Sequence, residues 1–508
     1  MSYNNAIRPY PECCNHSAEP DRRDDCKHDK KKPKCKRCGN LVQDFSFESQ
    51  YGPWVASNVT FTNTDVYEGA IQARLGPGVA SLYQIVSLEG VCRSPMLFSF
   101  NAVGSPLLGV QQELTLGILI AEVAWLDSNY NQIGLGLRMV IPGGRINSTA
   151  KITFFAQTDR PPEDTAFAKI SFSKGSPSFM SEADFIFIDG VLLAPMAYTD
   201  LIRNGDFEAN LFEWVANPDG DTAFLSSYKE SLEGAGHALT QVNGNLSQDI
   251  SVGHLPPQTS FLLSFAAQGT GNVGLTVRIE WLDYNDNPIG SGLNVSIPNE
   301  TLNNQQNYLS YLFVSYPMVP GTATARLTFY ATVPTTADFL RLDNVIFAPV
   351  LTQNLVNNPS FEDGLNYWQQ SLVNLIERND VYEGTADAGI GQIGGALWQD
   401  VDLYDPEGKC YLFSTGLGFR KTIETADFGT MIMKVIWLDR FDRELGVGLS
   451  LVSNRVLPTD TNTFIEWIPF AGVTEPAPAG TVRARILFSK TDSEGFIEVD
   501  NVVFAQLV

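Results

Sequence analysis

The sequence of 508 residues contains no long hydrophobic run. A helix that spans a bilayer needs about 20 consecutive apolar residues, and no stretch of the chain approaches that length. The segment from Met1 to Arg8 also lacks the hydrophobic core of a secretory signal peptide. We therefore expect no insertion into membranes, and no entry into the general secretion route by this chain unaided.

Histidine is scarce, and residue patterns typical of catalysis are missing. The four histidines are His16, His28, His237 and His254. The chain has no G-x-S-x-G turn, no H-E-x-x-H motif and no phosphate-binding glycine loop. Acidic pairs are too common here for a glycosidase pair to be excluded by counting, but no part of the chain carries an insertion large enough for a cleft. We expect no catalytic residues and no catalytic cofactor.

Charged residues make up only 18% of the chain, and their signs are unevenly distributed. The formal net charge is −23, yet residues 1–38 hold ten Lys or Arg against six Asp or Glu. The remainder is strongly acidic, which disfavours nucleic acid and anionic membranes as partners. With 44% hydrophobic residues, 42 Gly and 28 Pro, the composition suits many short strands and turns, and predicts an all-β protein.

One phrase occurs three times at a fixed interval. Residues Val123–Leu137 read VAWLDSNYNQIGLGL, and related phrases occupy Ile279–Leu293 and Val435–Leu449, so that their tryptophans stand 156 residues apart. A period of this length indicates a repeated domain. Each copy places two alternating apolar segments around a polar turn, which predicts a β-hairpin.

Three modules follow from this repeat. Each opens with a Phe-Glu pair followed by Trp, and each carries a Glu-Gly dipeptide further on, at Glu68-Gly69, Glu233-Gly234 and Glu383-Gly384. The boundaries define a Cys-rich basic arm at residues 1–39 and modules at 40–197, 198–351 and 352–508. Roughly eight or nine short strands per module favour an antiparallel β-sandwich, most simply a jelly roll. Because the linkers are very short, we expect the modules to form a semi-rigid rod.

The opening Asn/Gly-x-Phe-Glu with its Trp, a mid-strand Gln and the closing Asp-Asn-Val-x-Phe resemble the galactose-binding-like jelly rolls. They are similar to the carbohydrate-binding modules that accompany xylanases and cellulases. A narrower resemblance, through the NLVxxxxFE opening and the IGLGL hairpin, is to β-sandwich domains on spore-surface and filament proteins of spore-forming Gram-positive bacteria. The resemblance covers all three modules.

This resemblance implies a structural calcium ion in each module. In the carbohydrate-binding relatives a Glu of the opening motif, an Asp of the closing strand and backbone carbonyls hold the ion, and hard oxygen ligands suit Ca²⁺. The corresponding pairs are Glu48 and Asp189, Glu208 and Asp343, and Glu362 and Asp500. The alternative is that these carboxylates accept backbone N–H groups at strand ends.

Sugar-binding surfaces combine exposed aromatic rings with planar hydrogen-bonding side chains. The candidates here are Tyr83 with Gln84 and Trp398 with Gln399, whereas the second module has Ser247 before its Gln. Two further tyrosines, Tyr67 and Tyr382, offer additional rings. The tryptophans that recur in every module favour burial over ligand stacking: Trp54, Trp125, Trp214, Trp281, Trp368 and Trp437.

The N-terminal arm concentrates cysteine, at Cys13, Cys14, Cys26, Cys35 and Cys38. The C-x-x-C spacing suits zinc, and the two histidines of the arm offer further ligands. Adjacent cysteines rarely pair with each other, however, and they suit disulfides to neighbouring copies. Intermolecular disulfides, a zinc site and reduced thiols all stay open for the arm.

Two functions fit these observations. The first is a non-enzymatic structural protein of a cell or spore surface, a coat, exosporium or filament subunit, whose arm docks onto or cross-links the next copy. Its partner is then the protein itself. The second is a tandem carbohydrate-binding adhesin, whose weak sites for a cell-surface or environmental polysaccharide act together.

Overall fold

The computed structural model describes residues 37–50, 52–64, 66–105, 117–143, 145–146, 151–176, 184–216, 221–226, 230–241, 243–304, 307–333, 335, 337–421, 427–456, 464–493 and 495–508. Its regular structure is almost entirely β, as composition predicts, in six five-stranded antiparallel sheets. No helix within these ranges is long and apolar enough to cross a membrane.

The first module is a sandwich of two sheets with the same connection pattern as the two that follow. In strand order, its outer sheet comprises β1 (Val55–Ser57), β4 (Ala80–Ser87), β9 (Phe167–Lys174), β6 (Leu119–Leu126) and β7 (Gln132–Ile141). Its inner sheet comprises β2 (Val59–Thr62), β3 (Gln72–Leu75), β10 (Ile186–Pro195), β5 (Met96–Gly104) and β8 (Ile152–Gln157).

The second module repeats this order. Its outer sheet is β11 (Val215–Ala216), β14 (Gly244–Ser251), β19 (Thr324–Thr332), β16 (Gly274–Leu282) and β17 (Pro288–Ile297). Its inner sheet is β12 (Asp221–Ser226), β13 (Gly236–Gln241), β20 (Leu340–Val350), β15 (Ser260–Gly269) and β18 (Leu309–Val314). A short helix, α2 (Asn299–Asn304), follows β17.

The third module has the same arrangement, so the threefold repetition of one β-sandwich is confirmed. Its outer sheet is β21 (Gln369–Ser371), β24 (Ala396–Asp402), β29 (Arg483–Lys490), β26 (Asp427–Leu438) and β27 (Glu444–Val456). Its inner sheet is β22 (Val373–Glu377), β23 (Ala386–Ile390), β30 (Ile497–Gln506), β25 (Tyr411–Lys421) and β28 (Phe464–Val473).

The repeated hairpin supplies the largest core residue of each sandwich. Trp125, Trp281 and Trp437 are at most 1% exposed, which confirms the burial interpretation. The facing strand approaches each indole through a glycine, because a Cβ atom at Gly136 would lie 2.5 Å from the Trp125 ring. This close approach explains why the repeated phrase contains a G-x-G pattern after its turn.

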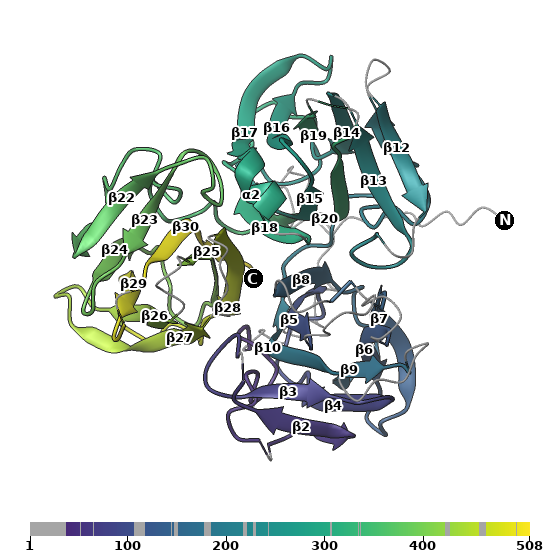
Figure 1. Ribbon diagram of the computed structural model, residues 1–508, viewed down its shortest axis with the longest axis vertical. Coiled ribbons are helices and arrows are strands. Elements are labelled where there is room, and N and C mark those ends of the chain that lie inside the picture. The colour runs from purple at the N-terminus through teal and green to yellow at the C-terminus, as the bar shows by residue number, and fades with distance from the viewer. Residues whose placement is uncertain are drawn as a thin grey trace, which may run out of the picture.

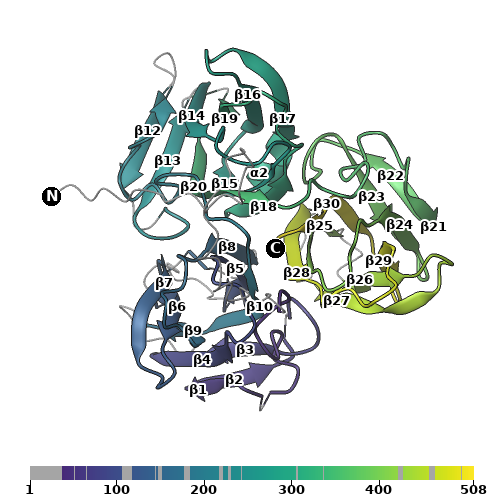
Figure 2. The same cartoon turned by 180° about the vertical axis from the view of Figure 1, so that it is seen from behind.

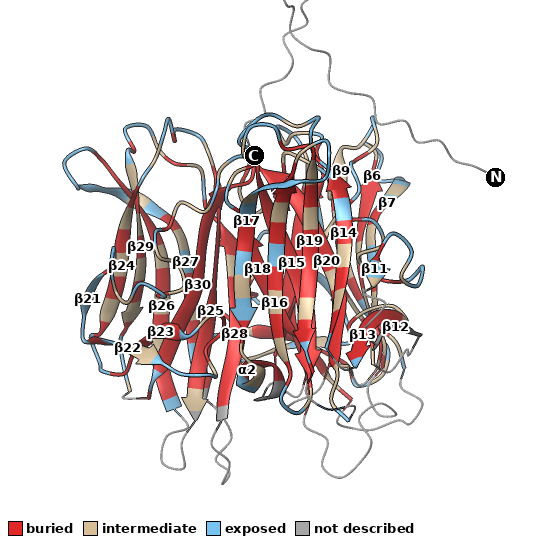
Figure 3. Cartoon of the chain, turned by 90° about the horizontal axis from the view of Figure 1, so that it is seen from above, coloured by how far each residue is buried: buried red, intermediate tan, exposed pale blue. Residues whose placement is uncertain are grey.

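The modules do not form the expected rod; they close into a ring around a central axis (Figures 1 and 2). The inner edge strands β8, β18 and β28 contact one another there. Strands β5, β15 and β30 are buried along their whole length, because one face covers the module's own core and the other faces the axis. Figure 3 shows β15 and β30 as buried strands. A cluster from all three modules fills the centre, including Leu97, Phe155, Leu262, Leu312, Leu412 and Val503. Apolar residues on both faces of the inner sheets make an open rod unfavourable.

A disulfide connects the start of the first module with the third. Cys38 and Cys410 are bonded across 372 residues of sequence, with their Cα atoms 5.6 Å apart. The expectation that Cys38 bonds a neighbouring copy or a metal is therefore wrong, because ring closure brings a cysteine of the same chain next to it. Cys92 is also disulfide-bonded. The remaining arm cysteines, Cys13, Cys14, Cys26 and Cys35, lie outside the described residues.

Replacement of Cys410 by Ser should destabilise the protein without changing its oligomeric state. The bond closes a very long loop, and disulfides of this kind contribute about 2–4 kcal/mol to the free energy of unfolding. Thermal unfolding without reductant, with size-exclusion chromatography of both proteins, measures the two quantities. High-mass species that disappear in Cys410→Ser would show instead that Cys410 bonds another copy.

Candidate functional site

The mid-strand glutamines are buried and bonded to the backbone. The Gln84 side chain accepts a hydrogen bond from the Gln43 N–H at 2.9 Å and donates one to the Gln43 carbonyl at 2.8 Å. Gln248 and Gln399 make the same pair of bonds, to Arg203 and Asn357. Each amide thus anchors the opening segment of its module to the outer sheet. This placement argues against the expected contact of Gln84 or Gln399 with sugar.

The aromatic residues beside Gln84 and Gln399 point the other way, onto the outer face of the sandwich. Trp398 is half-buried in the middle of the third outer sheet. Its cross-strand row is exposed or half-buried and reads, from β21 to β27, Gln369, Trp398, Leu487, Lys434 and Ser450. In the next row the Arg485 guanidinium donates two hydrogen bonds, of 2.6 and 2.8 Å, to the Asp400 carboxylate. The ring therefore lies among side chains that can bond hydroxyl groups.

The corresponding rows differ in the other two modules. Tyr83 occupies the position in the first module, with the ammonium group of Lys169 4.5 Å above its ring. An ion pair between Glu122 and Arg138 lies further along that row. Ser247 takes the position in the second module and leaves no ring there. The outer faces thus share one strand arrangement, but their rows carry different side chains, and only the first and third modules have an aromatic ring beside the glutamine.

The two other tyrosines considered for sugar binding lie between modules. Tyr67 and Tyr382 are at most 4% exposed. The Tyr67 hydroxyl donates to the Pro469 carbonyl of the third module, and the Tyr382 hydroxyl donates to the Ser310 carbonyl of the second. Neither ring is available on the surface.

The recurring Glu-Gly dipeptides join each module to its neighbour. The Gly69 N–H donates to the Val452 carbonyl of β27 at 2.8 Å, and the Val452 N–H donates to the Glu68 carboxylate at 3.1 Å. Gly234 makes the equivalent bond to Val140 of β7, and Gly384 makes it to Ser296 of β17. The bonds run from the first module to the third, the third to the second and the second to the first. The dipeptides are visible in the sequence as a repeat, but nothing in the local sequence indicates a partner in a neighbouring module.

The carboxylates expected to bind calcium hold the Glu-Gly loop in place. Asp189 accepts the N–H groups of Tyr67 and Glu68, whereas Glu48 accepts those of Ala70 and Ile71. The other predicted pairs lie in the same way around their loops: Glu208 with Asp343, and Glu362 with Asp500. The structure brings both members of each pair to one loop, in the backbone-bonding arrangement that was the alternative to calcium.

A metal ion at this loop stays a prediction. Within the described ranges, no group of three or more His, Cys, Asp or Glu residues is arranged to hold a metal. One buried oxygen there, Oε2 of Glu68, lacks a hydrogen-bond partner. Hard carboxylate oxygens of this kind are the donors that Ca²⁺ takes, so the chemistry of the donors fits although their geometry forms no cage.

The glutamates of the three dipeptides are poised to stay protonated. Burial is the main cause, and it raises the pKa of Glu68 to about 7, that of Glu383 to about 7 and that of Glu233 to about 8. Neighbouring carboxylates raise all three further, Glu48 acting on Glu68 for example. A carboxyl group buried between like charges favours its neutral form.

Comparison with known proteins finds only distant structural similarity. No family model and no curated protein matches the chain. The CBM22-1–CBM22-2 tandem domain of Paenibacillus barcinonensis Xyn10C covers 62% of this chain and 98% of its own, with 13% identity and a TM-score of 0.26. The C-terminal family 22 carbohydrate-binding module of Clostridium thermocellum Xyn10B covers 31% and 93%, with 14% identity and a TM-score of 0.24.

A third similar structure is TmCBM61 in complex with β-1,4-galactotriose, which covers 29% of this chain and 97% of its own, with 14% identity and a TM-score of 0.23. Two further similar structures are a bacteriophage CBA120 tailspike domain, with a TM-score of 0.23, and a Stig cyclase from Fischerella, with a TM-score of 0.24. At these identities and TM-scores the similarities carry no ligand, activity or family to this chain.

Raising the pH from about 4.5 to about 8 should lower the unfolding temperature of the ring. Glutamate titrates near 4.5 in the unfolded chain, but near 7, 8 and 7 at Glu68, Glu233 and Glu383 in the folded protein. The folded state binds these protons more tightly, so their stabilising effect is complete below about pH 4.5 and is lost as the pH rises through the folded values. Thermal unfolding across this range measures the effect.

Two comparisons sharpen the result. Glu68→Gln, which stays neutral at all pH values, should flatten the decline, whereas Glu122→Gln on the outer face should not. If calcium binds the loop, Ca²⁺ should restore stability at the alkaline end and a chelator should remove the gain. A pH-independent unfolding temperature would contradict the protonated glutamates, and no response of a calcium-stripped sample to Ca²⁺ would remove the ion site.

Proposed function

We propose that this protein is a non-enzymatic, rigid three-module scaffold that binds polysaccharide weakly through the outer faces of its first and third modules. The observation that carries the proposal is the half-buried Trp398, set in an open cross-strand row with Gln369, Lys434 and Ser450. An aromatic face flanked by hydroxyl, amide and ammonium groups matches a pyranose ring with its equatorial hydroxyls. Tyr83 offers a smaller version of the same platform.

The closed arrangement of the three modules determines how such sites act together. The outer sheets face away from the central axis in different directions (Figures 1 and 2). A single straight glycan chain therefore does not lie across two of them. Two weak sites on a rigid body of this kind connect separate glycan chains, and their combined strength arises when both chains belong to one insoluble surface.

Replacement of Trp398 by Ala should weaken retention on insoluble polysaccharide by about tenfold, the change produced by ~1.4 kcal/mol of lost contact energy. Tyr83→Ala should have a smaller effect. The matched variant is Ser247→Trp, which places a ring at the equivalent position of the second module and should increase retention. Pull-down on a panel of insoluble plant, fungal and bacterial polysaccharides measures all three. Equal retention of Trp398→Ala and the wild-type protein, with unchanged folding, would contradict the proposal.

A second candidate is a self-assembling subunit of a cell or spore surface. The specific observation is that the three described cysteines are all engaged in disulfides, whereas four more cysteines precede the first described residue. Because Cys38 and Cys410 bond each other, the disulfide of Cys92 uses one of the four cysteines that precede residue 37. At most three of Cys13, Cys14, Cys26 and Cys35 are therefore left for a covalent link to a neighbouring copy. Positive charge in residues 1–38 favours contact with the acidic body of another copy.

Negative-stain microscopy under oxidising and reducing conditions tests this candidate. The intact protein should form ordered assemblies, and the double variant Cys13→Ser/Cys14→Ser should shift toward single particles. Cys410→Ser is the matched control, because it removes a disulfide within the ring and should leave assembly intact. Single particles for the wild-type protein under both conditions, with retention on polysaccharide, would leave the first candidate alone.

A further inference from the structure

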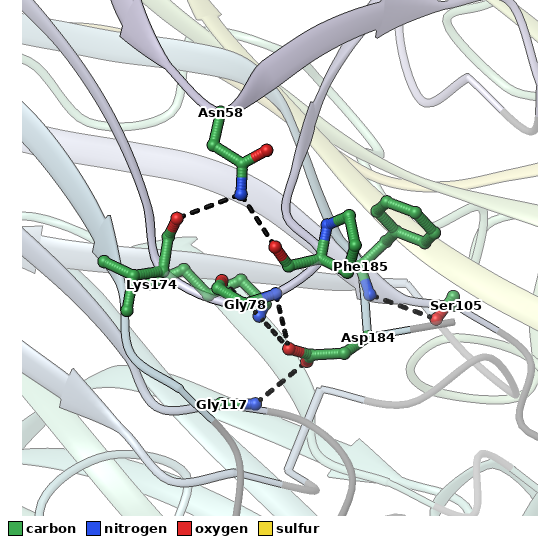
Figure 4. Close-up of polar contacts among 9 residues, drawn as sticks. Asn58, Gly78, Ser105, Gly117, Lys174, Asp184 and Phe185 are labelled. Carbon is green, nitrogen blue, oxygen red and sulfur yellow. Dashed lines mark hydrogen bonds and ion pairs between the residues drawn. The ribbon is translucent and has the colours of Figure 1, made fainter. Parts of the chain in front are cut away.

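A lysine and an aspartate lie buried against each other at one end of the first sandwich (Figure 4). Lys174 is the last residue of β9 in the outer sheet, and Asp184 precedes β10 of the inner sheet. Their side chains are 0% and 1% exposed, and Lys174 Nζ lies 2.5 Å from Asp184 Oδ2. The pair therefore bridges the two sheets in a place that bulk water does not reach.

Backbone groups fix the orientation of the pair. The Gly117 N–H donates to Asp184 Oδ1 at 3.2 Å, and the Gly78 N–H donates to Oδ2 at 3.1 Å. Lys174 Nζ also donates to the Gly78 carbonyl at 2.9 Å. Position 117 requires glycine, because a Cβ atom there would lie 1.9 Å from the Gly175 carbonyl oxygen. The carboxylate is thus held by two N–H donors while its Oδ2 faces the amine.

Burial makes this pair reactive as well as stabilising. Desolvation lowers the pKa of Lys174. In a low-dielectric interior, transfer of one proton from the ammonium to the carboxylate gives a neutral amine and a neutral carboxylic acid, and neither needs hydration. A neutral amine is a nucleophile, and the Gly117 N–H on Oδ1 stabilises the negative charge that develops there during attack.

We propose that Lys174 and Asp184 condense into an intramolecular isopeptide bond once the first module has folded. The ammonium group first passes one proton to Oδ2. The lone pair of Nζ attacks Cγ, the Nζ–Cγ bond forms and Oδ1 carries the developing charge at the Gly117 N–H. A second proton moves from the nitrogen to Oδ2, the Cγ–Oδ2 bond breaks and one water molecule leaves. No oxidant, cofactor or external reactant is consumed.

The bond fastens the sandwich where the disulfide does not. Asp184 precedes the first residue of β10 in the first module, whereas Cys38 joins Cys410, which lies next to Tyr411 in the third module, where Tyr411 pairs with Gln506 at the last residue of β30. The second module has Ala331 at the position equivalent to Lys174, so it lacks this linkage. The inference holds whether the protein binds polysaccharide, assembles with itself or does both.

Intact-mass spectrometry of the reduced, denatured wild-type protein tests the proposal directly. The mass should fall short of the sequence mass by one water molecule. Trypsin should then fail to cleave after Lys174 and should release residues 170–203 as one peptide, also short by one water, with no fragment ions from cleavage between residues 174 and 184. A wild-type mass equal to the sequence mass would overturn the proposal, and an ion pair would remain.

Variants separate the isopeptide from cyclisation of Asp184 onto its own backbone, which loses the same mass. Lys174→Arg should restore the full mass, whereas Lys169→Arg, on the same strand, should keep the deficit. A deficit that persists in Lys174→Arg would also overturn the proposal. The wild-type measurement decides the presence of the deficit without any variant, so a folding defect in Lys174→Arg does not prevent the test.

Discussion

Burial of the inner sheets on both faces is the constraint on which the architecture depends. Within one module, the strands nearest the axis cover the sandwich core with alternate residues, and their other face places apolar residues such as Leu97 and Phe155, together with buried polar ones such as Asn101, toward the axis. A single sandwich would expose this second face to water. The hydrophobic effect therefore favours packing of the inner sheets against one another. The three sandwiches pack around one axis, and their edge strands β8, β18 and β28 contact one another there. The ring follows from composition on these strands and needs no partner chain.

Hydrogen bonds between modules make this contact directional. The edge strands β7, β17 and β27 would otherwise present free backbone groups of the kind that recruit other chains. Each receives the Glu-Gly loop of the adjacent module, which satisfies a carbonyl on the edge strand. On the inner side Asn344 and Asn501 donate to the carbonyls of Phe155 and Leu312. The contacts are head-to-tail and close after three steps, which is how a heterologous interface gives a ring instead of a fibre.

The β-sandwich of each module is predictable from the sequence, whereas the packing of the three modules against one another is not. Trp125 and its counterparts were expected to be buried, because strong alternation places them on one face of a strand. The same alternation cannot tell whether a run such as LFSF at Leu97 is buried on one face or on two, and that difference separates a rod from a ring. Pairing of Cys38 with Cys410 depends on contact across 372 residues and has no local signal.

The candidate site was predicted in part for the same reason. Spacing along β4 and β24 placed Tyr83 and Trp398 beside a glutamine, but a planar amide that bonds a sugar and one that bonds the backbone look alike in sequence. The structure separates them, because Gln84 and Gln399 point to the buried face of their strands, whereas Tyr83 and Trp398 point to the partly exposed face. The Glu-Gly repeat was visible as a pattern, and only its cross-module partners reveal its role.

The disulfide has a counterpart in the polypeptide itself. Peptide segments carry the chain from the first module to the second and from the second to the third, and no segment carries it from the third back to the first. Cys38 and Cys410 supply the missing covalent connection at that junction. In the oxidised molecule every module is therefore covalently connected to both of its neighbours. The ring contacts depend on which modules adjoin and not on their order along the chain, because each junction uses the same loop and the same edge strand.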